Sequence, residues 1–287
     1  MTAGPPEGPA ADLATTATAP AVVEAAGVGK IFGTGPSAVT ALESIDLTIR
    51  QGEFVSLIGP SGCGKSTLLR LIADLTPPTT GTLTINGKPA ARARLDRDYG
   101  MVFQAPVLMD WRTVAKNIEL PLEIMGFDKT ERGRRSADLL RLVELEGFGE
   151  RHPWQLSGGM QQRVAIARAL AFDPKLLLMD EPFGALDEMT RERLNGELLN
   201  VCRETGATAL FVTHSISEAV FLSTRVVVLS PRPGRIARVV DVDLPRPRNE
   251  KTRALPRFFE LVTTVREHLV KDPALAPGPD GPRAAGS

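Results

Sequence analysis

The chain has 287 residues, of which 43% are hydrophobic and 24% are charged, a composition typical of a soluble globular protein with one large or two small domains. Lysine plus arginine and aspartate plus glutamate both total 34, so the formal net charge is zero and no overall charge favours binding to nucleic acid or to an anionic membrane. Cys63 and Cys202 are the only cysteines, which argues against a disulfide framework or a zinc site and fits a reducing cytoplasm. No apolar run reaches the roughly 18 to 20 residues that cross a bilayer, so we expect the chain not to span a membrane.

The two ends of the sequence have the composition of tails. Residues 1–25 are rich in Ala, Thr and Pro and lack the basic start and apolar run of a signal peptide, so we expect a disordered tail and no export. Residues 273–287 are rich in Pro, Gly and Ala, and we expect a second disordered tail there. Between the tails, we expect one domain over residues 26–240 and a helical extension over residues 241–272.

The region from residue 38 to residue 87 predicts a strand, loop and helix unit with a small antiparallel flank. We expect β-strands over residues 39–49, 54–58 and 81–85, with Asn86-Gly87 as a turn. The helix is expected to begin at Gly64.

The stretch GPSGCGKST stands between the strand and the helix of this unit. It fits the phosphate-loop pattern of Gly, four residues and Gly-Lys-Ser/Thr in the required context. Glycines let backbone N–H groups converge on phosphate oxygens, and the helix N-terminus adds a favourable dipole. Lys65 is placed to neutralise the outer phosphates and Ser66 to ligate Mg²⁺, whereas the alternative is an ordinary glycine-rich turn. The predicted nucleotide-binding residues of the loop are Gly59, Pro60, Ser61, Gly62, Cys63, Gly64, Lys65, Ser66 and Thr67.

The middle and the end of the chain predict a helical layer and a central sheet. Residues 113–145 have helical patterns with apolar residues on one side, so we expect a helical subdomain over about residues 105–165. Continuous apolar runs over residues 176–179, 209–213 and 225–229 are typical of parallel strands buried on both faces. The predicted fold class is therefore α/β, with an antiparallel β flank and an inserted α-helical subdomain.

Two carboxylates, Asp180 and Glu181, follow the apolar run of residues 176–179. In open α/β sheets, ligands bind at the carboxyl ends of the strands. We expect Asp180 to hold the metal ion, directly or through water, and Glu181 to polarise a water molecule for attack on the γ-phosphate. The alternative is an acidic cap on the following helix. A water nucleophile favours hydrolysis over transfer to another substrate.

The segment LSGGMQQR over residues 156–163 predicts a second anion-binding cradle. Ser157, Gly158 and Gly159 stand at the start of the helix expected over residues 160–171, where the alternative is an ordinary capped helix. The segment resembles the signature of ATP-binding cassette (ABC) proteins, and its position after GPSGCGKST and before LLLMDE matches theirs. The resemblance covers about residues 28–240 and implies a P-loop NTPase core of the ABC ATPase type, which binds ATP and Mg²⁺ and hydrolyses ATP.

The same resemblance implies roles for residues outside the three motifs. Gln104 resembles the family's glutamine that contacts the metal ion and the attacking water, and His214 resembles the switch histidine that contacts the γ-phosphate. Phe32 stands where the family often has a tyrosine that stacks on adenine, and residues 185–187 resemble the loop through which two subunits meet. Without the resemblance, Gln104 would be read as a solvated loop residue and His214 as a structural one. Cys63 is an ordinary variant of the loop and is expected to be inert.

The resemblance also implies partners and a location. In this family the signature of one subunit closes over the nucleotide held by its partner, which implies a homodimer around two ATP molecules. Residues 101–112, 211–220 and 230–235 look like those of the importers of nitrate, sulfonate and taurine. We therefore expect the ATPase subunit of a bacterial importer at the cytoplasmic face of the membrane. Its expected partners are membrane permease subunits and, through them, a solute-binding protein, with no nucleic acid.

Two other functions stay open. A soluble ABC ATPase of translation or DNA repair would carry tandem cassettes or a heptad coiled coil, and the sequence has neither. An importer of another solute, such as a pyrimidine precursor of thiamine, would use a similar ATPase because the ATPase does not touch the cargo.

Residues 105–112, with the sequence APVLMDWR, mix apolar and aromatic side chains with a proline. Such a stretch is seldom left open to water. We expect Val107, Leu108, Met109 and Trp111 to form the groove that receives a short cytoplasmic helix of the permease. The alternative is that the loop packs on the helical subdomain.

Overall fold

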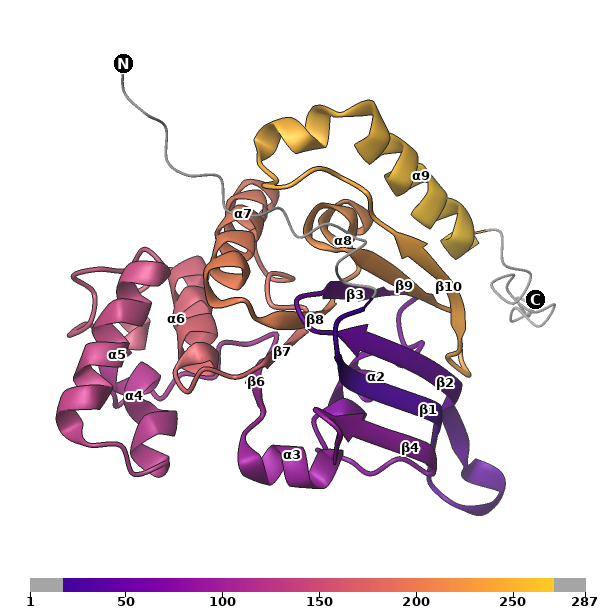
Figure 1. Ribbon diagram of the computed structural model, residues 1–287, viewed down its shortest axis with the longest axis horizontal. Coiled ribbons are helices and arrows are strands. Elements are labelled where there is room, and N and C mark those ends of the chain that lie inside the picture. Colours follow the sequence, from indigo (N-terminus) through magenta and orange to yellow (C-terminus); the bar gives the residue numbers. More distant parts are fainter. Residues whose placement is uncertain (1–17, 271–287) are drawn as a thin grey trace, which may run out of the picture.

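The computed structural model describes residues 18–270, which form two sheets, a layer of helices and a C-terminal helix (Figure 1). Within this part of the chain, one sheet has the strand order β2-β1-β4-β5 and the other the order β10-β9-β3-β8-β7-β6. The strands are β1 (Ala21–Phe32), β2 (Val39–Arg50), β3 (Phe54–Ile58), β4 (Thr80–Ile85), β5 (Lys88–Pro89), β6 (Tyr99–Val102), β7 (Leu176–Asp180), β8 (Thr208–Val212), β9 (Arg225–Leu229) and β10 (Ile236–Asp241). The α-helices are α2 (Lys65–Ile72), α3 (Ala90–Asp96), α4 (Val114–Ile124), α5 (Lys129–Leu142), α6 (Gly158–Leu170), α7 (Glu188–Thr205), α8 (Ile216–Leu222) and α9 (Pro256–Val270), and short 3₁₀ helices are η1 (Gly35–Ser37), η2 (Pro153–Gln155) and η3 (Glu250–Ala254).

The central sheet confirms the predicted α/β class. Strands β3, β6, β7, β8 and β9 pair in parallel, and β10 joins β9 antiparallel at one edge. Every residue of β3 and β8 is buried, because helices or the second sheet cover both faces. Alternate residues of β7 belong to different cores: Leu176 and Leu178 pack on the side of α2, and Leu177 and Met179 on the other side.

The antiparallel flank is also confirmed. Strand β1 pairs antiparallel with both β2 and β4, and helix α2 packs between this sheet and the central one. Strands β4 and β5 are joined by Asn86 and Gly87, which confirms the predicted turn, and the φ angles of 50° and 73° show that both residues are left-handed.

The predicted boundary of the N-terminal tail, at residue 25, is placed too late in the sequence. Residues 21–25 belong to β1, although the tail was expected to reach residue 25. Val22 and Val23 are buried, and the β1 backbone pairs with β2 on one side and β4 on the other. The strand is difficult to recognise from the Ala-rich composition of this region, because small residues are sufficient where neighbouring strands supply the packing. Residues 1–17 of the expected tail and the second tail, residues 273–287, lie outside the described residues.

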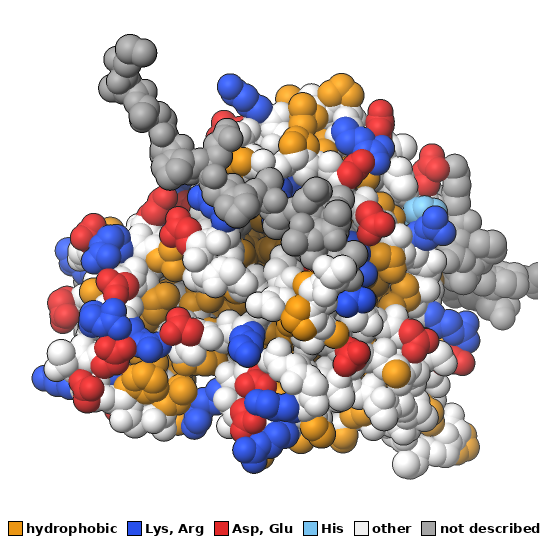
Figure 2. Space-filling model, viewed as in Figure 1, with side chains coloured by type: hydrophobic (Ala, Val, Ile, Leu, Met, Phe, Trp, Pro, Cys, Tyr) orange, Lys and Arg blue, Asp and Glu red, His pale blue; other side chains and the backbone are white. Residues whose placement is uncertain are grey.

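Helices α4, α5 and α6 form a layer at one side of the molecule (Figure 1). A proline at position 121 lies inside α4, and Asp128 caps α5 by accepting hydrogen bonds from two backbone N–H groups. Acidic and basic side chains are interspersed over the face shown in Figure 2, as the zero net charge leads one to expect. Among residues 18–270, no helix has both the length and the apolar composition that a bilayer span requires.

The C-terminal part of the domain becomes helical only from η3 (Glu250–Ala254) onward. Residues 241–272 were expected to be a helical extension, but residue 241 ends β10 and the α-helix runs over Pro256–Val270. Helix α9 packs on α8, β9 and β10 and buries Phe258, Leu261 and Val265. Residues 271 and 272 lie outside the described part of the chain.

Candidate nucleotide site

The predicted phosphate loop connects β3 to α2 at the carboxyl edge of the central sheet. Gly62 and Gly64 have φ angles of 73° and 106°, in the region that favours glycine, and Gly64 precedes the first residue of α2. A Cβ atom at Gly64 would lie 2.6 Å from Leu42 Cδ2, so β2 leaves no room for a side chain there. The loop is therefore wrapped closely between the two sheets, with its glycines required by conformation and by space.

Lys65 lies at the start of α2 and is almost fully buried, with a relative exposure of 7%. Its Nζ donates hydrogen bonds to the carbonyl oxygens of Gly59 at 2.8 Å and Pro60 at 3.0 Å. The loop thus holds one ammonium group beside the N-terminus of α2. Both features attract a phosphate group.

Ser66 and Asp180 join the phosphate loop to the end of β7. The Ser66 hydroxyl donates to Asp180 Oδ1 at 2.8 Å. A hydroxyl and a carboxylate are the oxygen ligands that Mg²⁺ prefers, usually together with water and phosphate oxygens. Two of the three side chains expected to contact Mg²⁺, Ser66 and Asp180, therefore converge and fit that ion.

Glu181 and His214 lie at the ends of neighbouring strands. The Glu181 backbone N–H donates to the carbonyl of Val212, the last residue of β8, at 3.0 Å. His214 Nδ1 then lies 3.3 Å from Glu181 Oε2. The φ angle of 46° at Glu181 is unusual for a residue with a side chain and marks a strained position at the site.

Gln104 reaches the same place from β6. A Cβ atom added to Gly184 would lie 3.5 Å from Glu181 Oε2 and 3.6 Å from Gln104 Nε2, so both polar atoms surround this glycine. Strands β6, β7 and β8 thus deliver Gln104, Glu181 and His214 to one edge of the sheet. The proximity of these three predicted residues follows from parallel pairing, since the strands end at the same side.

The LSGGMQQR segment forms a second helix start. Ser157 caps α6 by accepting a hydrogen bond from the Met160 N–H at 3.3 Å. A Cβ atom at Gly159 would lie 3.3 Å from Thr190 Cγ2, so α6 begins close to α7. Among residues 18–270, no hydrogen bond connects residues 157–159 with residues 59–67.

Phe32 lies at the end of β1 with 44% of its surface exposed. In the β1–β2 ladder Lys30 pairs with Leu42, the residue that contacts the phosphate loop, and Phe32 pairs with Val39. The Lys30 ammonium lies 5.1 Å from the Phe32 ring centroid. The aromatic ring is exposed two residues beyond the pair that approaches the loop, and it has no hydrogen-bonding group of its own.

One contact to the loop was not predicted. Arg232 Nη2 donates to the carbonyl oxygen of Gly62 at 3.2 Å, and the Gly234 N–H donates to Ala41 at 2.9 Å. The run SPRPGR contributed only to the family resemblance in the sequence. Its proline and glycine content indicates a turn, but no pattern shows which loop that turn will meet.

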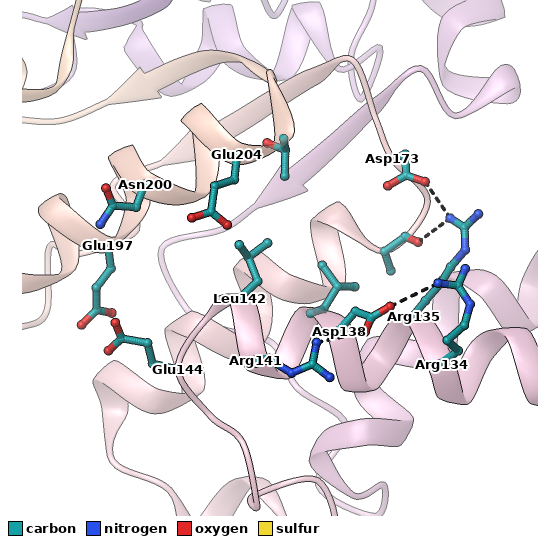
Figure 3. Close-up of a pocket in the computed structure, with 13 residues that line it drawn as sticks. Arg134, Arg135, Asp138, Arg141, Leu142, Glu144, Asp173, Glu197, Asn200 and Glu204 are labelled. Atoms are coloured by element: carbon teal, nitrogen blue, oxygen red, sulfur yellow. Dashed lines mark hydrogen bonds and ion pairs between the residues drawn. The ribbon is translucent and has the colours of Figure 1, made fainter. Parts of the chain in front are cut away.

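A pocket of about 670 Å³ between α5 and α7 lies outside this constellation (Figure 3). Its rim carries ion pairs such as Arg135 with Asp173 at 2.8 Å and Arg134 with Asp138 at 3.2 Å. None of its lining residues belongs to the phosphate loop, to residues 157–159 or to the ends of β6, β7 and β8. The pocket is therefore distinct from the candidate site.

Comparison with known proteins finds a matching family model, curated relatives and solved structures similar to this chain. A family model described as ABC transporter matches residues 42–184. The taurine import ATP-binding protein TauB of Burkholderia pseudomallei is 44% identical over 250 residues, which are 85% of this chain and 95% of that protein. The nitrate import ATP-binding protein NrtD of Synechocystis sp. is 45% identical over 244 residues, 83% of this chain and 91% of that protein. A solved dimeric ATP-binding cassette in a post-hydrolysis state with ADP and phosphate has a TM-score of 0.68 and 38% identity, covering 77% of this chain and 98% of that one.

Proposed function

The chain belongs to the ABC transporter family and is an ATP-binding, ATP-hydrolysing protein, and on this basis we propose how its residues use ATP and which process they drive. The observation that carries the proposal is the meeting of the Ser66–Asp180 pair and the Glu181–His214 pair at one edge of the central sheet. The backbone N–H groups of residues 59–67 and the Lys65 ammonium bind the phosphates. Ser66 and Asp180 would hold Mg²⁺, with Gln104 as a further ligand, and the ion would neutralise phosphate charge.

Hydrolysis then depends on Glu181. Its carboxylate accepts a proton from a water molecule as the water oxygen bonds to the γ-phosphorus, while the bond to the β-phosphate bridging oxygen breaks and ADP leaves. His214, 3.3 Å from the same carboxylate, contacts the γ-phosphate and holds its orientation. Phe32 stacks on the adenine ring. Nucleotide selectivity comes from this stacking and from shape, because phenylalanine has no hydrogen bond to offer.

A second copy of the chain completes the site. Ser157, Gly158 and Gly159 cap the nucleotide held by the phosphate loop of the partner, so that two ATP molecules lie in a head-to-tail homodimer. The dimeric state of the similar solved cassette supports this arrangement. Residues 185–187, next to the signature through Leu186, form part of the dimer contact.

The process driven by ATP is uptake of a small solute at the cytoplasmic face of a bacterial membrane. Two relatives of high identity are named as import proteins for taurine and nitrate, both small solutes that carry an oxygen-rich anionic group. We place this chain beneath a pair of permease subunits that receive the solute from a binding protein. A sulfonate, nitrate or similar oxoanion is the expected cargo.

The permease docks on the loop of residues 105–112. Arg168 fixes this loop by donating to the carbonyl oxygens of Val107 at 2.8 Å and Pro106 at 2.9 Å. Trp111 is nevertheless 76% exposed and Val107 54% exposed, whereas Leu108 packs partly against the core. The loop is therefore held firmly while it presents apolar side chains to a partner.

Co-purification with the permease tests the proposed function. Trp111→Glu should leave ATP binding intact but abolish assembly with the permease and solute-stimulated ATP hydrolysis, whereas Phe259→Glu, at a 59% exposed aromatic on α9, should change neither. Stimulation is measured in membranes with taurine, alkanesulfonates and nitrate. Full assembly and transport by Trp111→Glu would show that docking occurs elsewhere, and a chain that is never recruited to a membrane would favour a soluble ATPase.

A further inference from the structure

Three buried polar side chains from three elements meet directly behind His214. Thr213 follows β8 and has a relative exposure of 2%, Glu218 lies in α8 at 4%, and Asn195 lies in α7 at 1%. Buried polar groups are costly unless they are paired. A cluster of this kind beside a functional residue therefore needs a reason beyond general packing.

Thr213 is the centre of the cluster. Its hydroxyl donates to Glu218 Oε2 through a short hydrogen bond and accepts one from the Ser215 N–H at 3.0 Å. The Thr213 backbone N–H donates to the carbonyl of Leu57 at 3.2 Å, beside the phosphate loop. The residues on both sides of His214 are thus fixed by the Thr213 hydroxyl.

Glu218 is buried in α8, which packs on α7. Burial raises the pKa of its carboxyl, and the effects of Thr213, of Arg191 and Asn195 on α7, and of His214 oppose that rise. Arg191 Nη2 donates at 3.1 Å to the carbonyl of Leu186, in the loop of residues 185–187. The Glu218 carboxyl is therefore buried beside the histidine segment, and Arg191 on the neighbouring helix α7 is bonded to the proposed dimer contact.

The His214 side chain itself has little support. It is 56% exposed, and its ring Nδ1 lies 3.3 Å from Glu181 Oε2. The position of the ring consequently depends on the backbone of residues 213–215. A side chain that must meet a phosphate within a few tenths of an ångström requires such a backbone to be rigid.

We propose that Glu218 is a positioning residue for ATP hydrolysis, which holds His214 in place through its hydrogen bond with the Thr213 hydroxyl. This inference rests on the proposed role of His214.

The Thr213 hydroxyl gives the sharpest test. Thr213→Val is nearly isosteric and removes the hydroxyl, Thr213→Ser keeps it, and Thr224→Val is a matched control. Thr224 is also buried, and its hydroxyl bonds the Phe54 carbonyl at 2.9 Å, at the opposite end of β3. We expect Thr213→Val to lower kcat about tenfold or more with KM changed less than about twofold, while the serine variant and the control keep near-parental kcat.

Two further measurements separate positioning from loss of stability. The double variant Thr213→Val/His214→Ala should be no slower than His214→Ala alone, because the hydroxyl acts only through the histidine. If Thr213→Val does not fold, Glu218→Gln and Glu218→Met replace it. The Glu218→Gln side chain can still accept a hydrogen bond from the Thr213 hydroxyl, so this variant should keep the parental kcat. The Glu218→Met side chain cannot accept that hydrogen bond, so this variant should lose kcat.

The outcomes are distinct. Parental kcat in Thr213→Val, an equal loss in Thr224→Val, or additive losses in the double variant would overturn the positioning role of Glu218 while leaving the role of His214 intact. Parental kcat in His214→Ala would overturn the proposed role of His214 and the inference with it.

Discussion

Replacing Arg248 by methionine is expected to destabilise the chain strongly, although Arg248 lies far along the sequence from the phosphate loop. The guanidinium is 8% exposed and closes the C-terminal end of α8. It donates to the carbonyls of Ser223 at 2.7 Å, Phe221 at 2.8 Å and Val220 at 3.3 Å, and to that of Val242 at 3.4 Å. These carbonyls have no helical partner, and the negative end of the helix dipole favours a cation there.

The size of the effect follows from the two short bonds. A hydrogen bond to a charged group contributes about 1.5 to 3 kcal/mol, and a buried carbonyl left without a partner costs about 1 to 3 kcal/mol. Methionine avoids the cost of burying a charge, which offsets part of the loss. We expect a net loss of about 2 to 4 kcal/mol, which lowers Tm by about 5 to 15 °C in a domain of this size.

Thermal unfolding followed by circular dichroism measures the loss, with urea unfolding at 25 °C as a second measurement. The control is Arg266→Met, at an exposed arginine on α9, which should change Tm by less than about 2 °C. If Arg248→Met unfolds at the same temperature as that control, Arg248 does not hold α8 in the way described.

Three further predictions concern the nucleotide site. Lys65→Ala should abolish productive ATP binding, because the phosphates would lose the one cation that the loop holds; unchanged affinity in a fluorescent-nucleotide titration would contradict this. Ser157→Arg should leave ATP binding to the separate subunit intact but prevent ATP-dependent dimerisation, because a bulky cation would occupy the second cradle; a normal dimer in size-exclusion chromatography would count against it. Cys63 should resist alkylation at pH 7 to 8 in the folded chain and react after unfolding, because burial raises the pKa of its thiol despite the opposing charge of Lys65; rapid labelling of native Cys63 by iodoacetamide would refute this.

Much of the site could be predicted from the sequence because its parts are local. The phosphate loop, the two carboxylates after β7 and the cap of α6 each occupy a few consecutive residues between strong apolar runs. Parallel strands that end on one side of a sheet then bring Gln104, Glu181 and His214 together without further information. The burial pattern of β7 and β8 was predictable for the same reason.

The remaining features depend on contacts between distant segments. Residues 21–25 form a strand only because β2 and β4 provide ladders on both sides. Arg248 would be read as a surface charge, since nothing in its own segment shows the open end of α8. Thr213 and Glu218 are near each other in sequence, but Asn195 joins them only through the packing of α7 on α8.

The central claim is that Glu181 is the base that prepares water for attack on ATP, and the most direct test is the turnover of Glu181→Gln. An amide keeps the shape of the side chain and cannot accept the proton. We expect kcat to fall by about 10² to 10⁴ with the affinity for ATP unchanged, and the variant to accumulate as an ATP-bound dimer. ATP hydrolysis by Glu181→Gln at the parental rate would contradict the account.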